Sequence, residues 1–195
     1  MKQTEKILGI FAFLSILLEL LYDYPYVPEL IILSCFFLSL LYFFFSFLLL
    51  NDIRLRNVFK KESYKKISTI RIIGTIAAGV VFFIILTGIL FKFFNWPGGN
   101  YNLYIGLMLL LGISIIPIIK FLLTKAPFYR NLLIRFFVIG AIGIIFFSLS
   151  PELLIEMKYR NYPDYIEIEK ALLKDPYNET LIKKAQEERI KMNSK

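Results

Sequence analysis

Five long apolar stretches constrain this chain more than any other feature of its sequence. The hydrocarbon core of a bilayer is about 30 Å thick, and a helix needs about 20 residues to cross it. Backbone N–H and C=O groups that face lipid must be bonded within their own segment, so each stretch is predicted to be a helix. The predicted spans are residues 7–22, 30–50, 67–90, 101–119 and 132–149. The predicted fold class is therefore all-α, a polytopic membrane helix bundle.

The chain is predicted to divide into two parts at residue 150. We expect residues 1–150 to form a five-helix transmembrane domain and residues 151–195 to form a charged helical periplasmic tail. The tail holds nine Lys or Arg, nine Asp or Glu, and few large apolar side chains. Because so short a segment cannot bury a sizeable core alone, its helices are expected to rest on the membrane, on the span ends or on another protein.

Helix-start signals divide the tail into short helices. Ser150 is the predicted cap of the first, with Pro151 at the first helical position. A second helix is expected to start near residues 161–164, and a third, highly charged one runs from Glu179 to about Met192.

Basic side chains predict the orientation of the spans. If the amino terminus lies in the cytoplasm, nearly all Lys and Arg of the membrane part fall on the cytoplasmic side, as the positive-inside rule requires. These residues are Lys2, Lys6, Arg54, Arg56, Lys60, Lys61, Lys65, Lys66, Arg71, Lys120, Lys125, Arg130 and Arg135. The opposite side holds Lys92, Asp23 and Glu29. We therefore predict a bacterial inner (cytoplasmic) membrane protein with a cytoplasmic amino terminus and a periplasmic carboxyl terminus.

The excess of positive charge points to lipid as its partner. The formal net charge is +8, and all of the excess lies in the membrane part because the tail is neutral. Attraction to an anionic inner leaflet is a sufficient reason for such a basic rim. We therefore predict the lipid bilayer as a partner and no nucleic acid.

Two segments leave an alternative open. The first apolar stretch follows Lys2 and Lys6 as in a signal peptide, but residues 23–28 lack a small-residue cleavage pattern, so a retained helix is predicted.

The basic linker at residues 51–66 is interpreted either as a solvated connector that sets topology or as a brief interfacial helix.

The chain lacks the residues of most enzyme sites. It contains no His and one cysteine, Cys35, so the commonest metal ligand and the usual general base are missing, and no internal disulfide can form. No nucleophile with its base and no Gly-rich phosphate loop are recognisable. We expect no enzyme activity, no metal and no cofactor.

One ionisable residue lies well inside an apolar run. Glu19 is a candidate ion or proton site, because an ionisable group within a membrane span is usually functional. A structural interpretation is also open, in which Glu19 lies at the headgroup level and pairs with Lys92.

Small residues predict close helix packing. Gly74, Ala78 and Gly79 in the third span, and Gly140 and Gly143 in the fifth, have a spacing that lets two helix backbones approach each other. The partner of each surface is either another helix of the chain or a second copy.

Residues 91–99 form the most specific string of the sequence, Phe-Lys-Phe-Phe-Asn-Trp-Pro-Gly-Gly. It is predicted to be a helical hairpin turn on the outer side, where the Trp anchors at the interface and the Lys snorkels outward. The Pro is predicted to end the helix, and the two glycines permit the chain reversal. The turn and anchor residues are Lys92, Asn95, Trp96, Pro97, Gly98 and Gly99.

This string, together with the following residues 104–107, resembles the transmembrane hairpin of GldL, the motor subunit family of bacterial gliding and type IX secretion. In that family a Phe-Lys-x-x-His-Trp-Pro-Gly turn links two helices, and a glutamate in the second helix is implicated in using the proton gradient. The resemblance covers about residues 70–120, with Asn95 in place of the His and no Glu within residues 101–119. It implies a related hairpin in the cytoplasmic membrane, and without the Glu it does not imply a motor.

Together these features favour a non-catalytic integral membrane protein, an accessory or scaffold subunit of an inner-membrane complex. Its expected partners are other membrane or periplasmic proteins, or a second copy of the chain. The alternative is an ion- or proton-conducting protein that works as an oligomer with Glu19 in its path.

Overall fold

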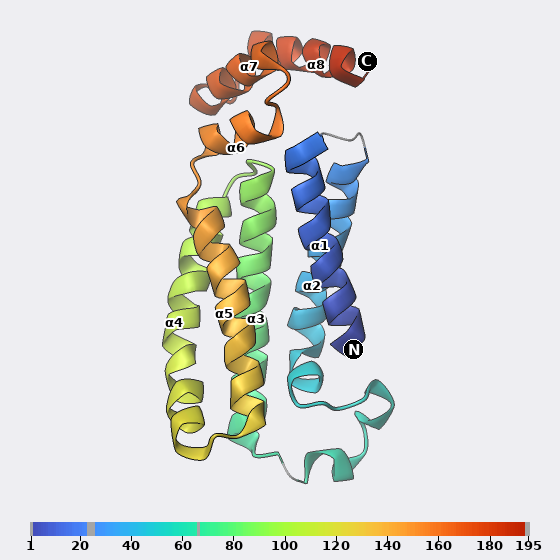
Figure 1. Ribbon diagram of the computed structural model, residues 1–195, viewed down its shortest axis with the longest axis vertical. Helices are drawn as coiled ribbons and strands as arrows, with labels where there is room; N and C mark the ends of the chain where they lie inside the picture. The colour runs from blue at the N-terminus through green and yellow to red at the C-terminus, as the bar shows by residue number, and fades with distance from the viewer. Residues whose placement is uncertain (1, 23–25, 66, 194–195) are drawn as a thin grey trace.

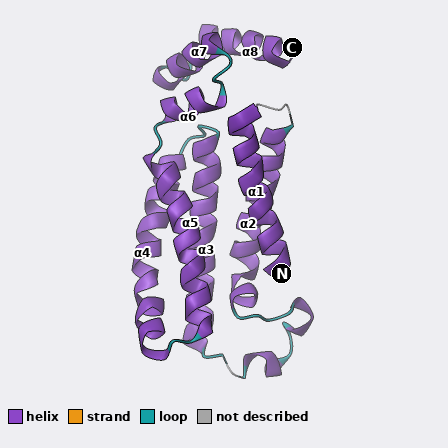
Figure 2. Ribbon diagram, in the orientation of Figure 1, coloured by secondary structure: helices purple, strands orange, loops and turns teal. Residues whose placement is uncertain are grey.

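Helices make up almost all of the structure. The computed structural model describes residues 2–22, 26–65 and 67–193. The chain is 85% helical, and these described ranges contain no β-strand, which confirms the predicted all-α class (Figure 2). The basic residue Lys66 and the acidic residue Asp23, both used above to predict orientation, lie outside the described residues.

The longest helices run side by side as an up-and-down bundle (Figure 1). They are α1 (Lys2–Tyr22), α2 (Val27–Leu50), α3 (Thr69–Phe93), α4 (Gly99–Thr124) and α5 (Pro127–Ser148). Consecutive helices run in opposite directions, so the chain enters near one end of the bundle and leaves at the other. We name the end with the 51–68 loop and the α4–α5 turn the basic end, after its Lys and Arg, and the opposite end the tail end.

Four helices within the described residues, α2 to α5, are long and apolar enough to cross a membrane. They give the chain the architecture of an integral membrane protein. The predicted fifth span is not confirmed, because α1 is not among them. That helix carries Lys2, Glu5, Lys6 and Glu19, and each charged side chain raises the free energy of inserting a helix into hydrocarbon.

The centre of the bundle is α3, which packs against α2, α4 and α5, whereas α1 packs mainly against α2. Phe82, Ile85 and Phe93 of α3 are fully buried. The ring of Phe82 contacts the rings of Tyr42 on α2 and Phe136 on α5, with centroids 4.8 and 5.4 Å apart. Aromatic side chains therefore fill the space where three helices meet.

Glycine allows the closest approach between α2 and α3. A Cβ at Gly79 would lie 2.1 Å from Ser46 Oγ and 2.5 Å from the carbonyl oxygen of Tyr42. Ala78, the preceding residue, is fully buried. Gly74 is different: a Cβ there would meet nothing within 4 Å, so this glycine lies outside the interface.

The small residues of α5 lie against α4 and α3. A Cβ at Gly140 would lie 2.8 Å from Leu110 of α4, and one at Gly143 would lie 3.0 Å from Ile85 of α3. Backbones that approach this closely gain van der Waals contact, the main attraction between helices in lipid. Within this chain, the partners of these small-residue surfaces are thus neighbouring helices.

The α3–α4 turn begins with a Schellman motif. Asn95 has a left-handed φ of 53°. The N–H of Trp96 donates to the carbonyl of Phe91 at 2.8 Å, and the N–H of Asn95 donates to that of Lys92 at 3.2 Å. The helix thus ends at Phe93, before Pro97 is reached. Asn95 reverses the chain there, because Asn tolerates the left-handed conformation that this motif needs.

The 51–68 loop contains two short 3₁₀ turns, η1 (Leu55–Asn57) and η2 (Lys61–Tyr64). The hydroxyl of Tyr64 donates to the carbonyl of Val58 at 2.6 Å, which folds the loop back on itself. Phe59 is 97% exposed. Of the two interpretations above, the connector fits better, because no α-helix forms in the described part of this loop.

The tail continues with α6 (Pro151–Lys158), which lies across the tail end of the bundle (Figure 1). As predicted, Ser150 caps it by accepting a hydrogen bond from the N–H of Leu153 at 3.1 Å. Ile155 and Lys158 are buried, and the Lys158 Nζ lies 4.8 Å from the centre of the Phe93 ring. This cation–π contact helps to hold α6 on the end of α3.

The last two helices, α7 (Pro163–Lys174) and α8 (Glu179–Asn193), pack against each other beyond α6. Tyr165 is buried, and its hydroxyl donates to Glu169 Oε1 at 2.5 Å. Burial and this carboxylate raise the pKa of Tyr165 above its usual range, so the phenol stays neutral. Helices α7 and α8 form a hairpin, the α7–α8 hairpin. It is joined to the rest of the protein mainly through the contact of α7 with α6.

Candidate functional site

A buried ion pair joins α1 to α5 towards the basic end. Arg135 Nε donates to Glu5 Oε1 at 2.6 Å, and Arg135 Nη2 donates to Glu5 Oε2 at 2.8 Å. Glu5 is only 9% exposed. The arrangement is bidentate, which is the strongest geometry for an arginine and a carboxylate.

Tyr42 of α2 completes this polar cluster, which we name the Glu5–Tyr42–Arg135 cluster. Its hydroxyl donates to Glu5 Oε1 at 2.5 Å, and the residue is 3% exposed. The carboxylate thus accepts three hydrogen bonds, from two different helices. A buried charge is tolerated only when it is paired and hydrogen-bonded in this way.

Arg135 lies inside the predicted span 132–149, but Glu5 was not among the predicted site residues. A usable signal was present, because Glu5 is the only acid beside the first apolar stretch on the same predicted side as Arg135. A lone intramembrane charge generally has a partner. The separation of 130 residues hides that partner until the helices are assembled.

A long apolar groove starts at this cluster and runs between α1 and α5, with α2 and α3 behind it. Its volume is about 720 Å³. Phe13 and Leu17 of α1 lie on one wall, and Val138 and Ile142 of α5 lie on the other. Residues of α6, including Met157, close it at the tail end.

The groove opens at the basic end into a more polar hollow, which we name the mouth. Its volume is about 590 Å³, and it is lined by Lys2, Lys6, Asn131 and Arg135. Gly9 lines both the mouth and the groove, so the two hollows are continuous. A mostly apolar cleft with a few polar groups at one end is the usual form of a ligand site.

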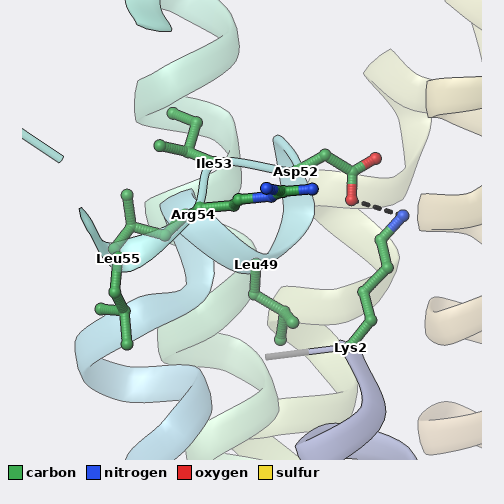
Figure 3. Close-up of a pocket in the computed structure, with 7 residues that line it drawn as sticks. Lys2, Leu49, Asp52, Ile53, Arg54 and Leu55 are labelled. Atoms are coloured by element: carbon green, nitrogen blue, oxygen red, sulfur yellow. Dashed lines mark ion pairs between the residues drawn. The ribbon is translucent and has the colours of Figure 1, made fainter. Parts of the chain in front are cut away.

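A second basic hollow lies beside the mouth, where α1 meets the loop after α2. Figure 3 shows Lys2 reaching from the start of α1 to an ion pair with Asp52, with Arg54 beside them. Its volume is about 300 Å³. Both members of the pair are about half exposed, so water screens their attraction.

The span residue Arg71 of α3 is also held by other side chains. Its Nε donates to Asn51 Oδ1 at 2.7 Å, and Asn51 Nδ2 donates to Thr75 Oγ1 at 3.0 Å. The guanidinium lies 3.4 Å from the centre of the Phe128 ring. The basic end of α2, α3 and α5 is thereby connected through one polar network.

The predicted ion-site residues lie towards the tail end. Glu19 is 3% exposed on α1, and Lys92 is 4% exposed on α3. Lys92 Nζ donates to Asn100 Oδ1 at the start of α4, at 2.7 Å. Pairing of Glu19 with Lys92 stays a prediction.

The hairpin-turn residues lie close together. The Trp96 indole stacks on Phe94 and is 41% exposed. Gly98 has a φ of 88°, and a Cβ at Gly99 would lie 2.6 Å from the backbone nitrogen of Lys92. Both glycines thus occupy positions where a side chain is unfavourable, one for conformation and one for space.

The geometry defines a class, an all-helical chain with the architecture of an integral membrane protein and an apolar groove between α1 and α5. In comparisons with protein families, with curated proteins and with solved structures, nothing matches this chain. The likeness to GldL therefore stays a resemblance of one hairpin.

Proposed function

We propose that the protein is a non-catalytic accessory or scaffold subunit of an inner-membrane complex, with five spans and a periplasmic tail. The observation that carries the proposal is the α7–α8 hairpin, which stands beyond the bundle and is attached mainly through α6. Ile190 of α8 is 69% exposed and Tyr177 before it is 90% exposed. We interpret these two exposed side chains as part of a protein-binding surface of the hairpin.

The five-span topology is supported by the course of α1, which lies beside α2 and runs antiparallel to it (Figure 1). Pairing of Glu5 with Arg135 lowers the cost of placing α1 in lipid, since both charges are compensated. The topology places the basic end in the cytoplasm and the tail in the periplasm.

Single cysteines test this topology. In a Cys35→Ala background, Ser63→Cys reports on the basic end and Asn178→Cys reports on the tail. With a membrane-impermeant maleimide added to intact cells whose outer membrane is permeabilised, we expect labelling at position 178 and none at position 63. Labelling of both positions from one side would remove the odd number of spans.

Purification in mild detergent tests the scaffold role. The wild-type chain is expected to elute with a companion protein, and Ile190→Ser on α8 is expected to lose it. Phe59→Ser is the matched control, because Phe59 is exposed at the opposite end of the bundle. A chain that always elutes alone as a monomer would argue against the proposal.

A second candidate is ion or proton conduction by an oligomer, favoured by the burial of Glu19 in an otherwise apolar part of α1. Proton flux into liposomes would be measured for the wild type and for Glu19→Gln. Conduction predicts flux that the substitution abolishes, and the absence of flux in both would eliminate this candidate.

A further inference from the structure

We propose that the groove and its mouth bind one anionic phospholipid of the leaflet at the basic end, with an acyl chain between α1 and α5 and the phosphate beside Lys6. The inference is independent of the scaffold role. It assigns a ligand to a site made only by this chain.

The charge of the mouth suits an anionic headgroup. Three basic side chains, those of Lys2, Lys6 and Arg135, and one carboxylate, that of Glu5, line it. Lys2 is paired with Asp52, and Arg135 is paired with Glu5. Lys6 is exposed and takes part in no ion pair among the described residues, so its ammonium group is the one best placed to bind a phosphate.

The size and shape of the groove suit an acyl chain. Its α1 wall extends from Glu5 to Leu20, which is about 22 Å at the helical rise of 1.5 Å per residue. One leaflet contributes about 15 Å of hydrocarbon, so the chain of a single lipid fits along it. The lining is almost entirely apolar once past Glu5 and Tyr42.

A helix of a partner protein or of a second copy is too large for the same space. A 20-residue helix is about 30 Å long and about 10 Å across, or about 2,400 Å³. The groove offers about 720 Å³. A whole helix would therefore stand partly outside the groove or separate α1 from α5 further, whereas an acyl chain would do neither.

The groove occupies a gap in the packing between α1 and α5. Helix α1 packs along α2, and the Glu5–Arg135 pair links it directly to α5. Between that pair and α6, the groove separates the two helices. A bound acyl chain would supply the packing that is missing there.

Native mass spectrometry of the full-length, delipidated protein tests the proposal. The probes are dioleoyl-phosphatidylglycerol and dioleoyl-phosphatidylcholine, which share acyl chains and differ in headgroup charge. We expect one tightly bound phosphatidylglycerol per chain. Phosphatidylcholine is expected to bind about fivefold more weakly, because the loss of one contact between a basic side chain and an anionic headgroup lowers affinity by about that factor. Equal affinity for the two lipids would overturn the headgroup assignment.

A matched pair of glycine variants tests the groove. A Cβ at Gly9 or at Gly112 meets nothing within 4 Å, so both helices accept a side chain, but only Gly9 lines the groove. Gly9→Leu fills the groove and is expected to lower phosphatidylglycerol affinity at least about tenfold, whereas Gly112→Leu on α4 is expected to leave it unchanged. Unchanged affinity in Gly9→Leu would overturn the proposal.

A matched pair of lysine variants tests the mouth. Lys6→Gln is expected to weaken phosphatidylglycerol about fivefold and to weaken phosphatidylcholine less, because the choline cation already offsets the charge of its phosphate. Lys120→Gln removes an exposed charge at the basic end of α4, outside the mouth, and is expected to change neither affinity. Equal losses in the two variants would show nonspecific surface attraction and overturn the site, as would cross-linking that places another helix across the groove.

Discussion

The two interfaces of α2 are built on opposite principles. Its contact with α3 is a glycine seam, in which Gly79 lets the Ser46 side chain and the Tyr42 carbonyl of α2 lie directly against the backbone of α3. Its contact with α1 lies beside the Glu5–Tyr42–Arg135 cluster and the apolar groove. Helix α1 is held to α5 by the Glu5–Arg135 ion pair. The first interface depends on contact area, and the second depends on compensated charge and on what fills the groove.

The difference goes with composition, because α1 carries four charged residues, Lys2, Glu5, Lys6 and Glu19, whereas α2 to α5 are apolar enough to cross a membrane. The apolar helices lose little when a neighbour shifts, since lipid can replace it. Helix α1 carries Glu5, which needs Arg135 and Tyr42 to stay in an apolar environment. Its position therefore depends on specific partners as well as on hydrophobicity.

The largest expected effect comes from breaking the buried pair. Arg135→Met leaves Glu5 buried with only the Tyr42 hydroxyl as a partner, and is expected to lower the free energy of unfolding by about 3–5 kcal/mol. Denaturation in detergent micelles measures the loss. The double variant Glu5→Gln with Arg135→Met is expected to recover most of it, and a double variant as unstable as the single one would contradict the pairing argument.

A smaller loss is expected from the glycine seam. Gly79→Ala places a Cβ where Ser46 and a backbone carbonyl already lie, at an expected cost of about 3 kcal/mol. Gly74→Ala is the control on the same helix, because its Cβ would enter open space. The midpoint of thermal unfolding is compared between the two variants. Equal midpoints would contradict the close packing of α2 against α3 at Gly79.

Removal of one hydrogen bond from the cluster has an intermediate effect. Tyr42→Phe keeps the ring against Phe82 and removes the hydroxyl that donates to Glu5. A hydrogen bond to a charged group contributes about 1.5–3 kcal/mol, so we expect a loss of about 2 kcal/mol. Calorimetry of the variant measures it, and a loss equal to that of Arg135→Met would show that the tyrosine is as important as the arginine.

The exposed ion pair in Figure 3 gives the smallest effect. Lys2→Gln removes the partner of Asp52, and both side chains are about half exposed. Such pairs contribute less than about 1 kcal/mol, and salt weakens them. Unfolding with and without added salt checks this, since a large and salt-independent loss would mean that the pair is shielded from water.

Much of the fold follows from local sequence. The apolar stretches gave the helices of the bundle, Ser150 with Pro151 gave the start of α6, and a helix from Glu179 was expected and found. Each of these signals acts within a few residues. The fifth predicted span, at α1, is not confirmed, because charges at Glu5 and Lys6 accompany the apolar core of that helix.

The site depended on interactions that local sequence does not reveal. Arg135 was visible as a charge inside a span, but its partner lies 130 residues earlier in the chain. Gly74 and Gly79 looked equally suited to packing, yet only Gly79 faces α2. The rotation of a helix about its axis decides such outcomes, and apolar residues on every side of a span do not fix that rotation.

The sequence by itself determined that most of this chain is helical and apolar enough for lipid, because helix formation and hydrophobicity are properties of contiguous residues. Tertiary structure alone decided which charges meet, which glycines are covered, and that a groove remains between α1 and α5. The reason is that these features depend on how far each helix is turned and shifted against its neighbours, and packing across the whole bundle sets those positions.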